Sequence, residues 1–147
     1  MTNHIEKIIE LNASIDRVWR ALTDFREFGT WFKVNIDVPF VLSEVSTGHM
    51  TYPGYEHIKW EARIQQMEAM KLFSFTWHPY AVNPKIDYSQ ESPTLVEFHL
   101  EPLLIGTRIV IIESGFDALP VDRKLEAFKM NQQGWSEQIK NIQTYLN

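Results

Sequence analysis

The sequence contains no cysteine, so disulfide bonds, a thiolate zinc site and a thiol nucleophile are all excluded. Basic residues are also few: 14 Lys and Arg stand against 19 Asp and Glu, for a formal net charge of −5. Without a basic surface, we expect no nucleic-acid partner and no polybasic membrane contact. No stretch approaches the roughly 20 apolar residues of a membrane span, and the start, MTNHIEKIIEL, has no uncharged apolar segment of signal-peptide length. We therefore expect a cytoplasmic protein with no membrane span.

Internal repeats, low-complexity tracts and obvious linkers are missing too, and the seven prolines are scattered along the chain. Because 147 residues suffice for one domain with a full core, we predict a single domain over residues 1–147. Aromatic residues are abundant, with nine Phe, five Trp and five Tyr. Such content is typical of either a large core or an aromatic-lined cavity, and composition does not distinguish the two.

The first third of the chain predicts one strand and two short helices. Ile5–Leu11 is rich in β-branched residues and alternates like a strand. Ser14 is a candidate N-cap for a short helix with one apolar face, and that face carries Ile15, Val18, Trp19 and Leu22. Asp24, with Glu27 three residues later, resembles a capping box and opens a second short helix.

From Lys33 onward the hydrophobic pattern has a period of two, which predicts strands. The expected strands are Lys33–Val38, Gly48–Tyr52, His57–Met67, Lys71–His78, Thr94–Glu101 and Thr107–Glu113. Their short connections favour an antiparallel meander. The longest expected loop, Tyr80–Pro93, is either a lid or a solvated excursion.

A long helix follows Leu119-Pro120. Its expected buried face has alternating spacings of three and four residues and consists of Leu125, Phe128, Gln132, Trp135, Ile139, Ile142 and Leu146. Only Gln132 on this face is not apolar. A helix with one long apolar face must bury it on a large partner, and the sheet is the partner available.

This order of elements is the helix-grip arrangement, and six segments carry a family resemblance. They are NASIDRVWRALTD (12–24), WF (31–32), LFSFTW (72–77), VEFHLEP (96–102), GTRIVIIESGF (106–116) and NQQGW (131–135). Together they cover nearly the whole chain in one order. The chain resembles the START-like superfamily, also called SRPBCC or Bet v 1-like. Within it, the chain is similar to the branch named after the C-terminal domain of the activator of the 90-kDa heat-shock protein ATPase.

The resemblance implies an α+β helix-grip fold. In that fold a curved antiparallel sheet of six to seven strands wraps around a long C-terminal helix, with two short helices after the first strand. It also implies a cavity between sheet and helix that often takes a hydrophobic or amphipathic small molecule, and no universal catalytic residue. The branch typically has a Gly-rich turn before the third strand, whereas this chain has only Gly48 there.

Glu113 and Gln132 are polar residues on otherwise apolar expected faces. Alternation places Glu113 on the inward face of its strand, together with Thr107, Ile109 and Ile111. A buried carboxylate is a candidate general acid or base. Alternatively, Glu113 accepts hydrogen bonds near the strand's end, where Gly115 permits an unusual backbone conformation. We favour the second interpretation, because no spacing places another acid, base or nucleophile beside Glu113.

The histidines match no recognised metal-ligand spacing, and we expect neither a metal nor a cofactor. His57 and His99 alternate with charged residues on the expected solvent face, where Arg108 could pair with Glu97 or Glu101. His78 ends a strand before the proline-containing loop, at the mouth of a pocket or as a strand cap. The segment ESGF lacks the first glycine of a nucleophile elbow, so serine chemistry is not expected.

The leading hypothesis is a small cytosolic domain that binds a hydrophobic or aromatic small molecule, more a binding protein than an enzyme. The expected lining residues are Trp31, Phe32, Met50, Tyr52, Trp60, Trp77, Phe98, Glu113, Phe116, Phe128, Gln132 and Trp135. One alternative is a chaperone ATPase co-factor, as in the namesake branch, although the eukaryotic activators carry an additional N-terminal domain. Another is a cyclase or hydrolase that uses Glu113. Either a monomer or a homodimer fits the sequence.

Overall fold

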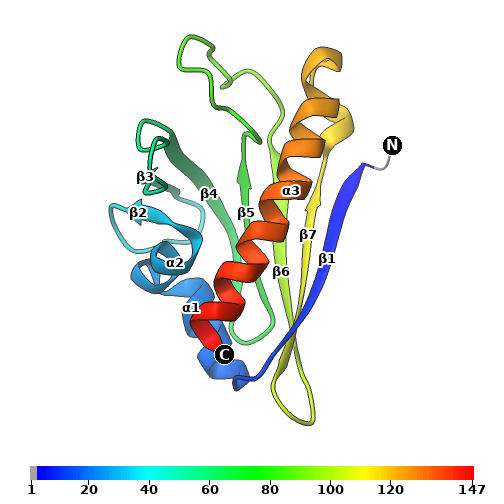
Figure 1. Ribbon diagram of the computed structural model, residues 1–147. Helices are drawn as coiled ribbons and strands as arrows, with labels where there is room; N and C mark the ends of the chain where they lie inside the picture. The colour runs from blue at the N-terminus through cyan, green and yellow to red at the C-terminus, as the bar shows by residue number, and fades with distance from the viewer. Residues whose placement is uncertain (1–2) are drawn as a thin grey trace.

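The computed structural model describes residues 3–147, in which seven strands form one antiparallel sheet behind a long C-terminal helix (Figure 1). The strands are β1 (His4–Leu11), β2 (Val34–Ile36), β3 (Val45–Met50), β4 (Lys59–Glu68), β5 (Leu72–Trp77), β6 (Thr94–Pro102) and β7 (Thr107–Ser114). Their order is β1-β7-β6-β5-β4-β3-β2, so β2 to β7 form the predicted meander. The first strand pairs with the last, from His4 opposite Ser114 to Leu11 opposite Thr107. The predicted α+β helix-grip fold is thereby confirmed, whereas the single domain over 1–147 stays a prediction and residues 1–2 lie outside the described residues.

The strand edges near the second helix differ from the prediction. Lys33 is not in a strand, because it ends α2 in a left-handed conformation with a φ of 67°. β3 begins at Val45 and ends at Met50, so Tyr52 lies in the following turn. Gly48 faces Trp60 on β4 and lies beside β2, where a Cβ would collide with the carbonyl oxygen of Asn35. Close approach of two backbones, not turn flexibility, therefore requires this glycine.

Two short helices, α1 (Ile15–Thr23) and α2 (Phe25–Phe32), precede the meander. The Asp24 carboxylate caps α2 by accepting from the backbone N–H groups of Arg26 and Glu27 at 2.9 and 3.1 Å. The predicted reciprocal half of the capping box is absent, because Glu27 binds Arg17 at 2.6 Å and Tyr145 at 2.8 Å instead. Although burial acts to raise the pKa of Glu27, hydrogen bonds from Tyr145 and Arg17 hold it below the ordinary value of 4.5.

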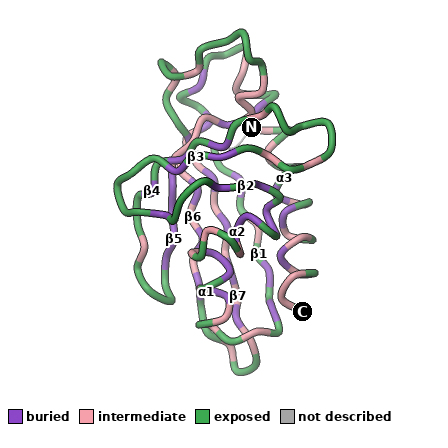
Figure 2. The backbone as a smooth tube through the Cα atoms, turned by 90° about the vertical axis from the view of Figure 1, so that its left-hand side faces the viewer, coloured by how far each residue is buried: buried purple, intermediate pink, exposed green. Residues whose placement is uncertain are grey.

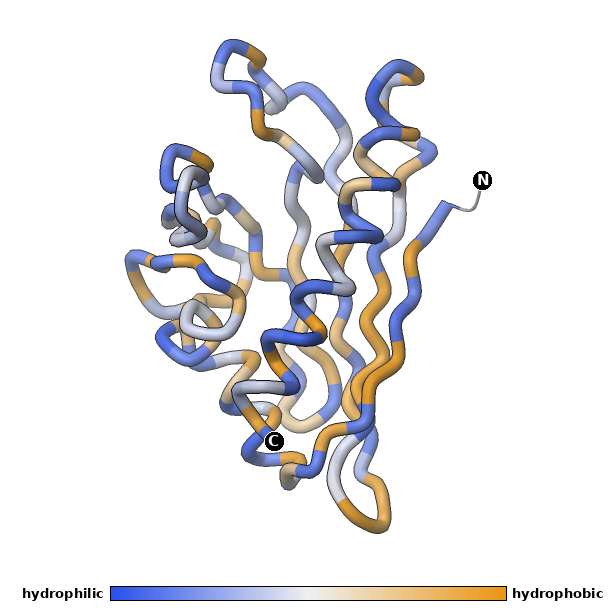
Figure 3. Tube along the Cα trace, in the orientation of Figure 1, coloured by the Kyte–Doolittle hydropathy of each residue, from blue (hydrophilic) through white to orange (hydrophobic). Residues whose placement is uncertain are grey.

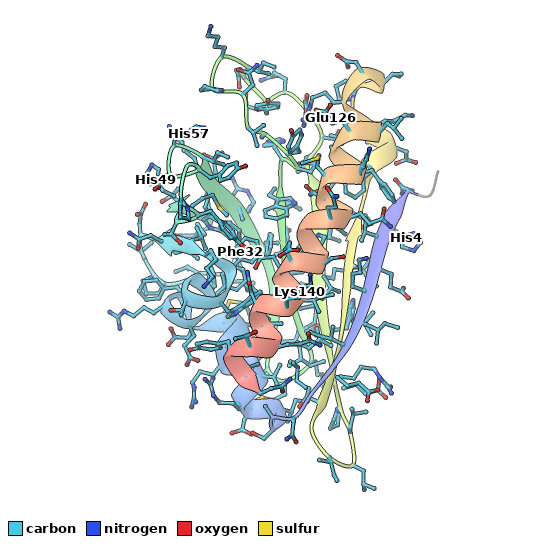
Figure 4. The ribbon with its side chains drawn as sticks, in the orientation of Figure 1. His4, Phe32, His49, His57, Glu126 and Lys140 are labelled. Atoms are coloured by element: carbon cyan, nitrogen blue, oxygen red, sulfur yellow. The ribbon has the colours of Figure 1, made fainter. Side chains whose placement is uncertain are left out.

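After a 3-10 turn at Phe116–Ala118, helix α3 (Val121–Leu146) crosses the concave face of the sheet. Gly115 allows this turn because its φ is 101°, as the sequence predicted. Figure 3 shows polar and apolar residues alternating along α3, and Figure 4 shows Lys140 and Glu126 on its outer side. No helix of residues 3–147 combines the length and the apolar character that crossing a membrane requires.

The core lies between the concave face of the sheet, the two short helices and α3, and it contains a cluster of aromatic rings. Figure 2 shows the buried segments of these elements in purple. Phe28 stacks on Phe32 with ring centroids 4.9 Å apart and also contacts Trp60 at 5.5 Å. Phe73 and Phe75, whose strand face was ambiguous in the sequence, both point into this cluster and are fully buried. Each such ring contributes about 1.5 to 3 kcal/mol on burial, so the aromatic content of the sequence serves mainly to build the core.

Candidate ligand-binding pocket

A pocket of about 940 Å³ lies between α3, the strands β4 and β5, and two loops. One of these loops joins β3 to β4, and the other, residues 78–93, joins β5 to β6. Lining residues such as Tyr55 and Ile86 are 57% and 47% exposed, so the pocket is open to solvent. Figure 4 shows Phe32 at its inner end, between α2 and α3, with His57 at the outer rim.

Four aromatic rings form the floor of the pocket. Phe32 contacts Trp60 at a centroid distance of 5.4 Å, and Trp60 contacts Trp77 at 5.7 Å. Trp77 then contacts Trp135 at 5.9 Å with the two ring planes 34° apart. Because the rings touch one another, they make a continuous apolar surface rather than a cage with space between the rings.

The three tryptophans of the floor direct their polar edges away from a ligand. Trp60 Nε1 donates to Ser46 Oγ at 2.9 Å, and Trp77 Nε1 and Trp135 Nε1 donate to Glu113 at 2.7 and 2.8 Å. An indole has a single N–H donor, and each is already used. The floor therefore offers ring faces and C–H edges to a bound molecule.

Glu113 lies behind this floor and is fully buried. Besides the two indoles, its carboxylate accepts from Thr94 Oγ1 at 2.6 Å and from Asn131 Nδ2 at 2.9 and 3.1 Å. The indole and amide groups are donors, which is the arrangement that suits an ionised, acceptor-only carboxylate. One side chain thus connects β7 to β5, β6 and α3, and it fixes the orientation of two floor rings.

This surrounding favours the second interpretation of Glu113, in which the carboxylate accepts hydrogen bonds. The carboxylate does not line the pocket, and four donor side chains occupy its acceptor sites. The arrangement favours a positioning role for Glu113, whose partners are the Thr94 hydroxyl and side chains of β5 and α3.

Polar side chains of α3 lie at the edge of the pocket. Gln138 Nε2 donates to the carbonyl oxygen of Phe32 at 2.9 Å, and Asn141 Nδ2 donates to the Tyr52 hydroxyl at 2.9 Å. These bonds fix α3 against α2 and the β3–β4 turn. At the opposite edge, His78 has a buried Nδ1 with no hydrogen-bond partner within residues 3–147.

The structure brings together half of the twelve predicted lining residues. Those that line the pocket are Phe32, Met50, Tyr52, Trp60, Trp77 and Trp135. Trp31 and Phe98 belong to the core, where the Trp31 indole donates to the Ala21 carbonyl at 2.8 Å. Phe116 of the 3-10 turn and Phe128 of α3 contact each other, with ring centroids 5.2 Å apart.

The predicted inward position of Gln132 is wrong, because its side chain is exposed and does not lie on the buried face of α3. The observed face runs through Ala127, Asn131, Trp135, Gln138 and Ile142. Leu125, also predicted to be inward, is 65% exposed. Phe128, Ile139 and Leu146 of the predicted face do pack against the core, so the buried face lies to one side of the predicted one, toward Asn131 and Gln138.

The charged and imidazole side chains of the sheet do not converge. Arg108 binds Glu10 at 2.9 Å and the predicted Glu101 at 3.3 Å, and His99 lies 3.6 Å from Glu97. Among residues 3–147, no group of three or more His, Asp or Glu side chains is placed to hold a metal ion.

Comparison with known proteins identifies the same architecture. Residues 12–147 match the family model described as Activator of Hsp90 ATPase homolog 1-like protein. Protein MLL2253 from Mesorhizobium loti superposes with a TM-score of 0.75 at 18% identity, over 96% of this chain and 94% of that one. The Aha1 dimer from Colwellia psychrerythraea gives a TM-score of 0.71 at 16% identity, over 99% and 96%. A comparison with curated proteins gave no match.

Proposed function

The chain belongs to the Activator of Hsp90 ATPase homolog 1-like family, and on that premise we propose that it is a binding domain for a hydrophobic or aromatic small molecule. The molecule occupies the pocket between the sheet and α3. The observation that carries the proposal is the 940 Å³ pocket with its floor of Phe32, Trp60, Trp77 and Trp135. Small-molecule sites commonly measure about 300 to 1,000 Å³ and are mostly apolar with few polar groups.

Apolar burial supplies most of the affinity in this proposal. A ligand that removes roughly 200 Å² of apolar surface from water gains about 5 kcal/mol, before the cost of association. Polar direction comes from the rim, because the indole N–H groups of the floor are occupied. The candidate is the Tyr52 hydroxyl, which can donate while it accepts from Asn141.

Two measurements test the proposal. Native mass spectrometry of the purified protein looks for a co-purified small molecule. A titration with the neutral aromatic fluorophore N-phenyl-1-naphthylamine then measures binding directly. We expect saturable binding that Trp60→Leu weakens and that Trp19→Leu, a tryptophan change on α1 outside the pocket, leaves unchanged. Absence of saturable binding in the wild-type protein contradicts the proposal.

A second candidate function, a co-factor of a chaperone ATPase, rests on the family membership itself. It needs an outer surface rather than the pocket. Stimulation of a chaperone ATPase by stoichiometric amounts of this protein supports it, and an unchanged ATPase rate removes it. Native mass spectrometry also distinguishes the monomer and homodimer that the sequence left open.

A further inference from the structure

One wall of the pocket is formed by the segment 79–91, called the wall loop below. Residues 80–84 and 86–89 of this loop line the pocket. The loop stands at the top of the molecule in Figure 1, next to the first turns of α3. Its position therefore determines how enclosed a bound molecule is.

The hydrophobic core does little to hold the wall loop. Within residues 3–147, Pro79 is buried and Tyr80 packs against the core, both at the start of the loop, whereas the loop tip from Asn83 to Asp87 is exposed. Several hydrogen bonds, such as the one from Asn83 N to the Tyr88 hydroxyl at 3.1 Å, are internal to the loop and fix its local shape. They do not fix its position on the sheet.

Arg123, in the first turns of α3, supplies the external attachment. Its Nη1 donates to the Tyr80 carbonyl at 3.0 Å and its Nη2 to the Pro79 carbonyl at 2.9 Å. Nε and Nη2 also bind both oxygens of Glu91, at 2.8 to 3.2 Å. The guanidinium carbon lies 4.6 Å from the centre of the Tyr88 ring. Across residues 3–147, every hydrogen bond and ion pair between the wall loop and the rest of the chain involves Arg123.

This attachment is well placed to be strong. The Arg123 and Glu91 side chains are only 14% and 13% exposed, so water screens their pairing little. The planar guanidinium matches the fork geometry of a carboxylate, which a lysine does not. Arg123 also binds the carbonyl oxygens of Pro79 and Tyr80, which lie on either side of the Tyr80 Cα. The φ of Tyr80 is 50°, an unfavourable conformation for a bulky residue. Arg123 thus adds to the core packing of Tyr80 in holding that residue in the left-handed region.

We propose that Arg123 and Glu91 form a clamp that holds the wall loop over the pocket, and that Arg123 is a positioning residue that sets ligand affinity without touching the ligand. Neither side of the ion pair faces a bound molecule, since neither Arg123 nor Glu91 lines the pocket. The affinity part of this proposal rests on the proposed binding function, whereas the clamp itself does not.

The test compares Arg123→Met, Arg123→Lys and Glu91→Gln with the wild type. Lys124→Met is the matched control, because Lys124 is the next residue of α3 and its side chain makes no hydrogen bond or ion pair within residues 3–147. The rate of amide hydrogen exchange in the wall loop, measured without ligand, reports directly whether the clamp holds the loop in place. Titration with N-phenyl-1-naphthylamine reads its effect on the pocket.

We expect Arg123→Met and Glu91→Gln to speed exchange in the wall loop by about tenfold or more, as the loss of a charged hydrogen-bonded contact predicts. Exchange in β6 and β7 and in the Lys124→Met control stays as in the wild type. Arg123→Lys should give an intermediate exchange rate, because lysine keeps the positive charge but lacks the planar guanidinium that binds both carboxylate oxygens. The dissociation constant of the probe rises several-fold in Arg123→Met.

The outcomes separate the two ideas. Unchanged loop exchange in Arg123→Met overturns the clamp, whatever the probe does. Faster exchange with unchanged probe affinity overturns the role of the clamp in binding. A wild-type protein that does not bind the probe overturns the proposed function and the affinity role, while the exchange data still decide whether the clamp exists.

Discussion

The replacement Glu113→Gln tests the proposed positioning role of the buried carboxylate. Gln has nearly the same shape, but one of its two terminal groups is an NH₂ donor. Thr94 can rotate its hydroxyl and Asn131 can turn its amide to accept from that donor. An indole cannot, so either Trp77 or Trp135 loses its acceptor, whichever way the Gln amide is oriented.

A buried N–H without an acceptor costs about 1 to 3 kcal/mol. Two further effects oppose each other. Gln makes weaker hydrogen bonds than a carboxylate, which lowers stability, but it does not place a charge in the interior, which raises stability. We therefore expect Glu113→Gln to lower the free energy of unfolding by about 2 kcal/mol, or Tm by roughly 4 to 8 °C. Glu113→Leu leaves Trp77, Trp135 and Asn131 without an acceptor, and its expected loss is about 3 to 6 kcal/mol.

Urea denaturation followed by tryptophan fluorescence measures both losses, and near-ultraviolet circular dichroism reports the orientation of the two indoles. Glu6→Gln, an exposed carboxylate on β1, is the control and should change stability by less than about 0.5 kcal/mol. In a double-mutant cycle, Trp135→Phe should cost less in the Glu113→Gln background than in the wild type. A Glu113→Gln variant as stable as the wild type would refute the assignment of Glu113 as the residue that fixes the floor.

Three further predictions concern pH, packing and the pocket. Hydrogen bonds hold the pKa of Glu27 below its ordinary value of 4.5, so its carboxylate stabilises the fold above that pH. This stabilisation is lost as pH falls further. The difference in Tm between wild type and Glu27→Gln should therefore be largest near pH 7 and decrease below pH 4.5. Gly48→Ala should lower stability by about 1 to 3 kcal/mol in urea denaturation, since its new methyl group meets the Asn35 carbonyl. Gln132→Ala should leave the dissociation constant of N-phenyl-1-naphthylamine unchanged because Gln132 does not line the pocket, and a clear weakening would contradict its placement.

Sequence reasoning found the order of elements because hydrophobic periodicity reports which face of each element is buried. Alternation on β4 placed Trp60, Ala62 and Ile64 inward, and all three are buried. The same reasoning failed on α3, where the buried face contains two polar residues, Asn131 and Gln138. A hydrophobic pattern cannot choose Asn131 over Gln132, since neither is apolar, and only the position of their partners decides.

The pocket was predicted in part for a related reason. Its floor consists of aromatic residues that alternation can find, such as Trp60 and Trp77. Its wall consists of loop residues without a repeating pattern, and the loop's position depends on Arg123, which lies far along the chain from Glu91. Glu113 was recognised as an unusual inward acid, but its four partners are scattered over β5, β6 and α3, and no local spacing indicates them.

The pairing of β1 with β7 has a consequence for biosynthesis. Leu11 is opposite Thr107, so about 96 more residues must be synthesised before the partner of the first strand exists. At roughly 5 to 20 residues per second, that interval is about 5 to 20 s. Until then, the strand that carries Ile5, Ile9 and Leu11, which are buried in the finished protein, lacks its pairing partner. The ribosome-bound chain therefore presents an unpaired apolar strand, the kind of segment that chaperones bind and that aggregates when they do not.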